Sequence, residues 1–254
     1  MPTQINEYEK TRFSAETRQG HVIEHDVYWR GHGAIVVLIQ ELPGIGQSTL
    51  RLADKLVDAG FAVAMPHLFG TIGRTSVGAN LLRVFCLRKE FSLFSRNKAS
   101  PIVDWLKALC GSIRDQKGVP GVGVIGMCLT GNFAISLMAD ESVLAAVSSQ
   151  PAMPFSDPAA LHMSDAEITE IKANIDRNEP IKAYRFENDW MSKQVKFDAL
   201  AREFNTDKDR VDMKVLPGNG HSVLTRDFVD NQGHPTYEAL EEVLDYFQRV
   251  LVSR

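Results

Sequence analysis

Apolar residues gather in short runs that alternate with stretches of helical periodicity. The runs at 34–40, 61–66, 122–126 and 144–151 lack polar alternation, which predicts strands buried on both faces of a parallel sheet. Two further strands are predicted at 181–187 and 211–217. Helical spacing predicts helices at 48–59, 101–110, 129–139, near 192–204 and at 236–251. Alternating strands and helices predict an α/β protein with a mostly parallel central sheet and helices on both faces.

Three segments depart from this alternation. Residues 20–30 alternate loosely and predict an early antiparallel strand or hairpin. The stretch 68–100 is rich in glycine, arginine and aromatic residues and reads as an excursion at the strand ends. Residues 157–178 form a polar, partly helical insertion. Because the sequence shows no repeat, linker or low-complexity segment, we expect a single domain over 1–254.

Composition narrows the class of protein. Hydrophobic residues make up 44% and charged residues 24%, which is ordinary for a soluble globular chain. The net charge of -4, with both signs interspersed, argues against a nucleic-acid partner. The first fifteen residues lack the apolar core of a signal peptide, and no run is long enough to span a membrane. We therefore expect a cytoplasmic protein with no membrane partner. The sequence leaves the oligomeric state open and is compatible with a monomer.

The most informative motif is a buried strand followed by Gly126-Met127-Cys128-Leu129-Thr130-Gly131 and a predicted helix. This order resembles the nucleophile elbow of α/β-hydrolases, a tight strand-to-helix turn that carries the nucleophile. The second glycine stands one position late, with the small Thr130 in its usual place. A thiol at a helix N-terminus is favoured as thiolate, so Cys128 is the predicted nucleophile. Cys110, inside an apolar helix, and Cys86 are better read as small buried hydrophobes.

A nucleophile requires a base and a group that orients the base. His221 lies in a glycine-rich loop after the last predicted strand, where this fold places its base. Asp189 follows the preceding strand and is the predicted acid, with Glu187 ranked second. Asp189 is alternatively an N-cap of the next helix. The order Cys128, Asp189, His221 along the chain is the order that the fold requires.

The chain resembles the dienelactone hydrolase family. The resemblance rests on residues 40–44, 60–68, the Cys128 elbow, 187–189 and 220–222. A glutamate after the first long strand, together with a cysteine in the elbow, is specific to that family. The resemblance implies that Glu41 contacts the resting thiol. It also implies an oxyanion hole made by the backbone N–H groups of Leu129 and Leu42. The family's substrate-binding arginines imply Arg226 and, in the excursion, Arg83, with Arg74 and Arg88 as alternatives.

These observations predict a cysteine-nucleophile hydrolase of small esters or lactones that works through an acyl-enzyme. We expect no cofactor and no metal, because His and Cys never occur at ligand spacing. The expected partner is a small-molecule ester or lactone. Three alternatives stay open: hydrolysis of another ester or thioester, acyl transfer to an acceptor other than water, and a non-catalytic redox sensor that uses Cys128.

Overall fold

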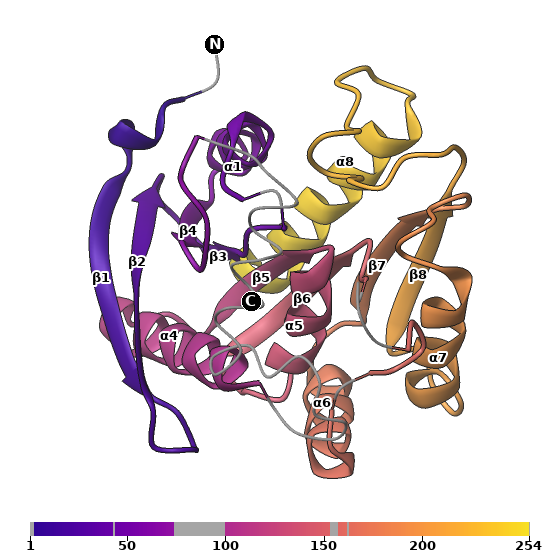
Figure 1. The fold of residues 1–254 in the computed structure, drawn as a ribbon, viewed down its shortest axis with the longest axis horizontal. Coiled ribbons are helices and arrows are strands. Elements are labelled where there is room, and N and C mark those ends of the chain that lie inside the picture. The colour runs from indigo at the N-terminus through magenta and orange to yellow at the C-terminus, as the bar shows by residue number, and fades with distance from the viewer. Residues whose placement is uncertain (1–2, 43, 74–99, 153–156, 162, 254) are drawn as a thin grey trace.

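The protein is described by a computed structural model that covers residues 3–42, 44–73, 100–152, 157–161 and 163–253. Its described strands form one sheet of eight in the order β1-β2-β4-β3-β5-β6-β7-β8 (Figure 1). From β4 to β8 neighbouring strands are parallel, and the β1–β2 and β2–β4 pairs are antiparallel. The strands are β1 (Glu9–Glu16), β2 (Val22–Arg30), β3 (Ile35–Leu38), β4 (Ala62–Pro66), β5 (Val122–Met127), β6 (Val143–Ser149), β7 (Ile181–Phe186) and β8 (Val211–Leu216).

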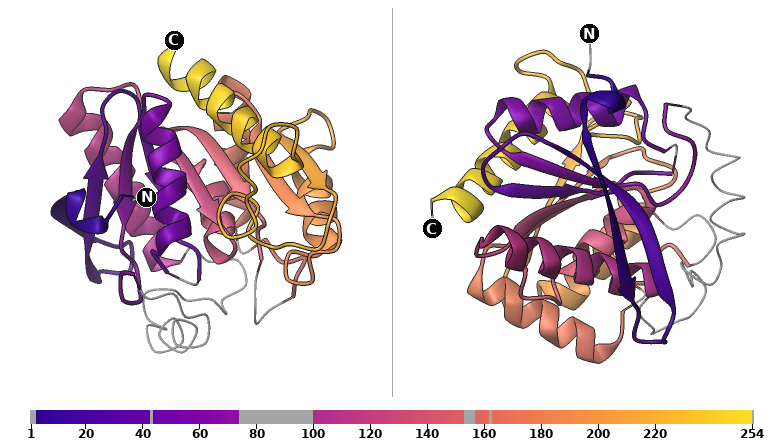
Figure 2. Two further views of the ribbon diagram at one scale, coloured as in Figure 1. Left: turned by 90° about the horizontal axis from the view of Figure 1, so that it is seen from above. Right: turned by 90° about the vertical axis from the view of Figure 1, so that its left-hand side faces the viewer.

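Helices cover both faces of this twisted sheet (Figure 2). One face packs against α1 (Gln47–Asp58) and α8 (Pro235–Phe247), and a short π-helical turn, Gln248–Val252, continues α8. The opposite face packs against α4 (Pro101–Lys117), α5 (Leu129–Leu137), α6 (Asp165–Arg177) and α7 (Gln194–Phe204). Side chains of β3 point alternately into the two cores, Val37 into one and Val36 into the other. The prediction of an α/β fold with buried parallel strands is therefore confirmed.

The first strand, β1, was not predicted from the sequence. Its residues are mostly exposed, so it has no run of apolar positions to signal a strand. Backbone pairing along the whole of β2, from Glu9 opposite Trp29 to Glu16 opposite Val22, holds it instead. A cross-strand ion pair between Lys10 and Asp26 adds to this pairing.

One helix boundary also differs from expectation. Helix α4 continues past Cys110 to Lys117 and ends at Gly118, whose left-handed conformation suits glycine. The predicted insertion at 157–178 contains α6, which begins at a capping box between Ser164 and Glu167. Most of the predicted excursion at 68–100 lies outside the described residues.

The parallel topology brings the chemistry-bearing residues to one edge of the sheet. Cys128 follows β5, and Asp189 and His221 lie in the loops after β7 and β8. Glu41 follows β3, the neighbour of β5. The carboxyl ends of parallel strands share one edge, which is where open α/β sheets bind their ligands.

Candidate active site

Cys128 occupies a sharp turn between β5 and α5. Its backbone has φ 58° and ψ −121°, a conformation that non-glycine residues rarely adopt. The Cys128 N–H donates to the Ser149 carbonyl at 3.0 Å, and its own carbonyl accepts from Ala152 N–H at 3.1 Å. Both bonds tie the turn to the end of β6. Such strain persists only where surrounding structure fixes it, and it concentrates at functional sites.

The flanking residues explain why this turn tolerates threonine in place of glycine. A Cβ on Gly126 would lie 2.0 Å from the Thr130 carbonyl oxygen, so that position requires glycine. The Thr130 hydroxyl accepts a hydrogen bond from Met127 N–H at 2.9 Å and lies 3.1 Å from the Gln40 carbonyl. Gly131 approaches β6 closely, since a Cβ there would lie 3.0 Å from the Ser149 carbonyl oxygen. Thr130 thereby joins the turn to the segment after β3.

Asp189 and His221 are in direct contact. Nδ1 of His221 lies 2.7 Å from Oδ2 of Asp189, whose side chain is fully buried. The other carboxylate oxygen, Oδ1, accepts hydrogen bonds from Met191 N–H at 2.9 Å and Ser192 N–H at 3.0 Å. Asp189 is not an N-cap, because Lys193 takes that position in α7. The rival acid Glu187 contacts Asn188 and lies at the exposed edge of the loop.

The environment of His221 favours its protonated form. The His221 and Ser222 N–H groups both donate to Oδ2 of Asp227 at 2.8 Å, which fixes the backbone of the loop. Nε2 of His221 is buried and makes no hydrogen bond of ordinary geometry within the described chain. Burial lowers the pKa of His221, but Asp189 and the nearby Cys128 sulfur outweigh burial and raise this pKa to about 10. The imidazole ring is thus placed between the carboxylate and the thiol.

Glu41 is hydrogen-bonded to the loop that carries His221, and its implied contact with the resting thiol stays a prediction. Its Oε1 accepts a hydrogen bond from the Thr225 hydroxyl at 2.6 Å, and its Oε2 accepts one from the Ser222 hydroxyl at 3.0 Å. No hydrogen bond joins Glu41 to Cys128 among the described residues. Two hydroxyl donors of the His221 loop thus bind the buried carboxylate. Burial raises the pKa of Glu41 despite both hydrogen bonds.

The two predicted oxyanion donors flank the turn. Leu129 is the first residue of α5, where a backbone N–H has no partner within the helix. Leu42 follows the Gln40 carbonyl that Thr130 contacts. In the described part of the chain, neither N–H donates a hydrogen bond to another backbone group. The two N–H groups stay the predicted donors to a developing oxyanion.

Of the predicted substrate arginines, Arg226 lies within the described residues. Arg226 lines an open recess of about 410 Å³ together with Phe186, Phe228 and His234, and Cys128 is not among the residues that line it. The positive charge of Arg226 acts to lower the pKa of Glu41, against the larger effect of burial. Arg83 and its alternatives Arg74 and Arg88 lie outside the described residues.

Several residues at the site were missed in the sequence analysis. Ser222, Thr225 and Asp227 were missed because short polar side chains near a histidine are common in loops. Arg185 did carry a signal, because it is a charged residue within the otherwise buried end of β7. Among the described residues, no group of three or more His, Cys, Asp or Glu side chains could hold a metal ion. No described helix is long and apolar enough to cross a membrane.

The strand order, the turn at Cys128 and the parallel sheet define an α/β-hydrolase fold. Residues 25–251 match the model of the dienelactone hydrolase family. The chain belongs to the dienelactone hydrolase family, and its class of enzyme is carboxylic ester hydrolase. No curated protein matches the chain in sequence.

Solved structures share the fold at low identity. A protein assigned as a dienelactone hydrolase from Klebsiella pneumoniae subsp. pneumoniae MGH 78578 superposes with a TM-score of 0.65 at 14% identity, covering 95% of this chain and 99% of that one. A dienelactone hydrolase-like promiscuous phosphotriesterase from metagenomic libraries gives 0.63 at 15% identity, over 95% and 99% of the two chains. Carboxyl esterase 2 from the mycorrhizal fungus Tuber melanosporum gives 0.62 at 13% identity, over 96% and 88%.

Proposed function

We propose that this protein hydrolyses small esters or lactones through a cysteine acyl-enzyme, with Cys128 as nucleophile, His221 as base and Asp189 as orienting acid. The observation that carries the proposal is the 2.7 Å contact between Asp189 and His221 beside the strained Cys128 turn. An oriented imidazole next to a thiol is the arrangement that nucleophilic acyl transfer requires. It also favours an enzyme over a redox sensor, because reversible oxidation of a thiol needs no oriented base.

The first half of the reaction forms a thioester. His221 takes the Cys128 proton at Nε2, and the sulfur attacks the carbonyl carbon of the substrate. The carbonyl oxygen becomes an oxyanion, which the N–H groups of Leu129 and Leu42 stabilise. Collapse of this intermediate breaks the bond to the leaving oxygen, which receives the proton from His221. With a lactone, the leaving oxygen stays attached to the acyl group.

The second half returns the free enzyme. His221 removes a proton from water, and the resulting hydroxide attacks the thioester carbonyl. Collapse of the second oxyanion releases the carboxylic acid, and the thiolate of Cys128 leaves as the pair with protonated His221. Asp189 keeps Nδ1 of His221 protonated in both halves, so that Nε2 remains the atom that moves protons.

Glu41 has a different role in this proposal from the one that the resemblance implies. Its two hydrogen bonds anchor Ser222 and Thr225, which follow His221. Arg226 and Arg83 remain the proposed contacts for a carboxylate on the substrate, and a small dienelactone remains the leading substrate because of the family.

The proposal is tested by hydrolysis of p-nitrophenyl acetate and of a dienelactone by wild type, Cys128→Ala and Cys110→Ala. Cys110 is a matched control, a second fully buried cysteine inside α4. We expect Cys128→Ala to lose at least about 10³-fold in kcat and Cys110→Ala to keep its rate. Mass spectrometry after acid quench is expected to find the acyl group on Cys128. A folded Cys128→Ala with the wild-type rate, or a folded wild type inactive on both substrates, would overturn the proposal.

A further inference from the structure

Arg185 is a buried arginine beside the candidate site that makes no ion pair within the described chain. It lies near the end of β7 and is 3% exposed. Its guanidinium donates three hydrogen bonds to neutral acceptors. Nε donates to the Ser192 carbonyl at 2.7 Å, Nη1 to Oε1 of Gln194 at 2.9 Å, and Nη2 to the Glu187 carbonyl at 3.0 Å.

These acceptors enclose the loop that carries Asp189. Glu187 precedes Asp189 by two positions, and Ser192 follows it by three. The guanidinium therefore joins the two ends of the loop, as a rigid planar fork can and a single ammonium group cannot. Ser192 also donates its N–H to Oδ1 of Asp189, so the residue that Arg185 holds is itself a hydrogen-bond donor to the acid.

Arg185 also interacts electrostatically with Asp189. The Asp189 side chain is fully buried, and a carboxylate in such a place is costly unless charge or hydrogen bonds stabilise it. Burial lowers the pKa of Arg185, and the attraction of Asp189 opposes this effect. Because the direct partners of Arg185 are uncharged, its positive charge is not cancelled by them.

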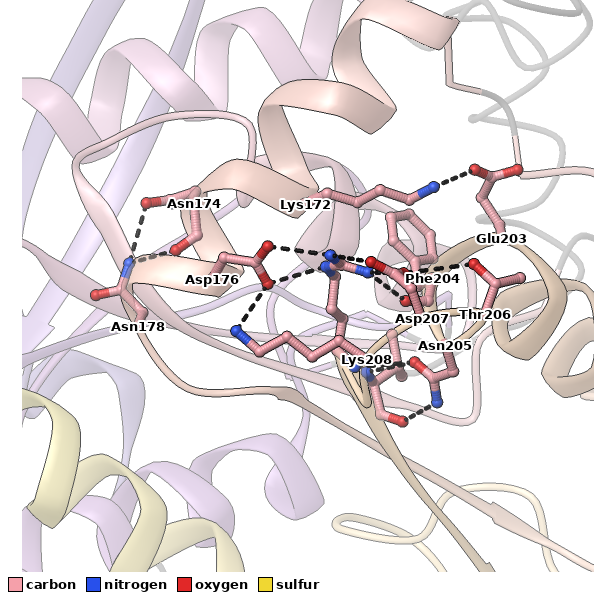
Figure 3. Close-up of polar contacts among 12 residues, drawn as sticks. Lys172, Asn174, Asp176, Asn178, Glu203, Phe204, Asn205, Thr206, Asp207 and Lys208 are labelled. Carbon is pink, nitrogen blue, oxygen red and sulfur yellow. Dashed lines mark hydrogen bonds and ion pairs between the residues drawn. The ribbon is translucent and has the colours of Figure 1, made fainter.

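Arg210 shows the contrasting arrangement. It is also buried, at 6% exposed, but lies at the start of β8, away from the edge that holds Asp189. Its guanidinium forms ion pairs with Asp176 at 2.9 Å and Asp207 at 2.5 Å, two carboxylates labelled with Lys208 in Figure 3. The two carboxylates thus balance the charge of Arg210. Arg210 is therefore a suitable control residue for Arg185.

We propose that Arg185 is a positioning residue that closes the Asp189 loop, so that Asp189 keeps its contact with Nδ1 of His221. This inference rests on the proposed function, in which the Asp189–His221 pair serves Cys128. The charged and titratable groups that interact with the pair or its loops are Cys128, Glu41, Arg185 and Asp227. Asp198 acts in turn on Arg185, and Arg226 acts on Glu41. Of these, only Arg185 contacts both ends of the acid's loop.

The test compares wild type, Arg185→Met, Arg185→Lys and the control Arg210→Met. Two pH profiles are measured between pH 5 and 10. One is the rate of Cys128 alkylation by iodoacetamide, read on the Cys128 peptide by mass spectrometry. The other is kcat/KM for p-nitrophenyl acetate. Urea unfolding of each variant separates effects on stability from effects on the profiles.

Arg185→Met is expected to move the acidic limb of both profiles to higher pH by about one unit or more. Without the guanidinium the loop is no longer closed, so Asp189 loses its fixed contact with His221, and the imidazolium–thiolate pair that this contact supports is less favoured. Arg185→Lys can bond one end of the loop but not both, so we expect a smaller shift with kcat lowered about 10-fold. Arg210→Met is expected to have a lower free energy of unfolding and the same two pH profiles as wild type.

Unchanged profiles in a folded Arg185→Met would overturn the inference while leaving the hydrolase proposal intact. Conversely, a wild type that hydrolyses no ester, but whose alkylation profile shifts in Arg185→Met, would overturn the hydrolase proposal alone. If Arg185→Met does not fold, Arg185→Lys carries the test. A wild-type kcat in that variant would then count against the role of the fork and overturn the inference.

Discussion

Oδ2 of Asp189 lies 2.7 Å from Nδ1 of His221, although 32 positions separate the two residues along the chain. The contact joins the loops after β7 and β8, two neighbouring parallel strands whose registered pairing ends at Phe186 and Leu216. The same edge of the sheet holds Cys128 after β5. The geometry of the pair therefore follows from strand order and loop length, and it makes the role of each partner testable by substitution.

Asp189→Asn is expected to lower kcat for ester hydrolysis by about 10³- to 10⁴-fold, because an amide lets the imidazole take the wrong tautomer. Glu187→Gln supplies the control, since Glu187 is the other acid in this loop and lies at its exposed edge. We expect that variant to hydrolyse the ester at the wild-type rate. The reverse ranking, with Glu187→Gln the slower enzyme, would transfer the role of the acid to Glu187.

The raised pKa of His221 makes stability depend on pH. This pKa lies at about 10, above the ordinary value of 6.5, so the folded state binds the proton more tightly than the unfolded state does. The resulting stabilisation is full below about pH 6.5 and is lost as pH rises towards 10. Asp189→Asn removes the main cause of the rise. Urea unfolding is therefore expected to show a gap between wild type and Asp189→Asn that is largest at pH 6 and narrows towards pH 10. A gap independent of pH would contradict this linkage.

The raised pKa of Glu41 makes stability depend on pH in a different way, because Glu41 is an acid that burial disfavours in its charged form. Burial raises its pKa above the ordinary value of 4.5, so ionisation of Glu41 is less favourable in the folded state than in the unfolded chain. Glu41→Gln keeps a group that can bond the Ser222 and Thr225 hydroxyls but cannot ionise. We expect this variant to gain stability relative to wild type as pH rises from 4 to 7, by on the order of 1 kcal/mol. Glu187→Gln again serves as the control, and an equal pH dependence of the two variants would refute the assignment.

The parts of the fold that were predicted are those with a local signal. The unbroken apolar runs at 34–40 and 61–66 became β3 and β4, because a strand buried on both faces needs apolar side chains at every position. Strand β1 was missed because it is held by backbone pairing and exposed ion pairs, which leave no apolar pattern. The excursion at 68–100 falls mostly outside the described residues, so its prediction stays a prediction.

The site divides in the same way. The positions of Cys128, Asp189 and His221 after three strands could be read from local motifs, although their catalytic roles stay predictions. The hydrogen-bond partners of Glu41 could not be read from local motifs. Ser222 and Thr225 are 181 and 184 positions away, and no local pattern encodes such a contact. Family resemblance placed Glu41 near the thiol, and only side-chain geometry shows which of several nearby donors it binds.

Thr130 offers a final test of how the elbow is built, because it stands where the motif has glycine. Its hydroxyl pairs the Met127 N–H and lies within bonding distance of the Gln40 carbonyl, all in a buried position. Thr130→Val keeps the shape but removes the hydroxyl, so those backbone groups lose their partner. We expect the free energy of unfolding to fall by about 1–3 kcal/mol. We also expect kcat to fall, because the segment that carries Leu42 loses its tether to the turn.

Thr130→Ser is the matched control for this substitution, since it keeps the hydroxyl and removes only a methyl group. It is expected to retain most of the stability and most of kcat, and both quantities are measured by urea unfolding and ester hydrolysis. A serine variant that lost as much as the valine variant would show that keeping the hydroxyl does not preserve the turn. The hydroxyl would then have no part in holding the elbow. The glycine at position 131 would be the remaining reason why the turn tolerates threonine at position 130.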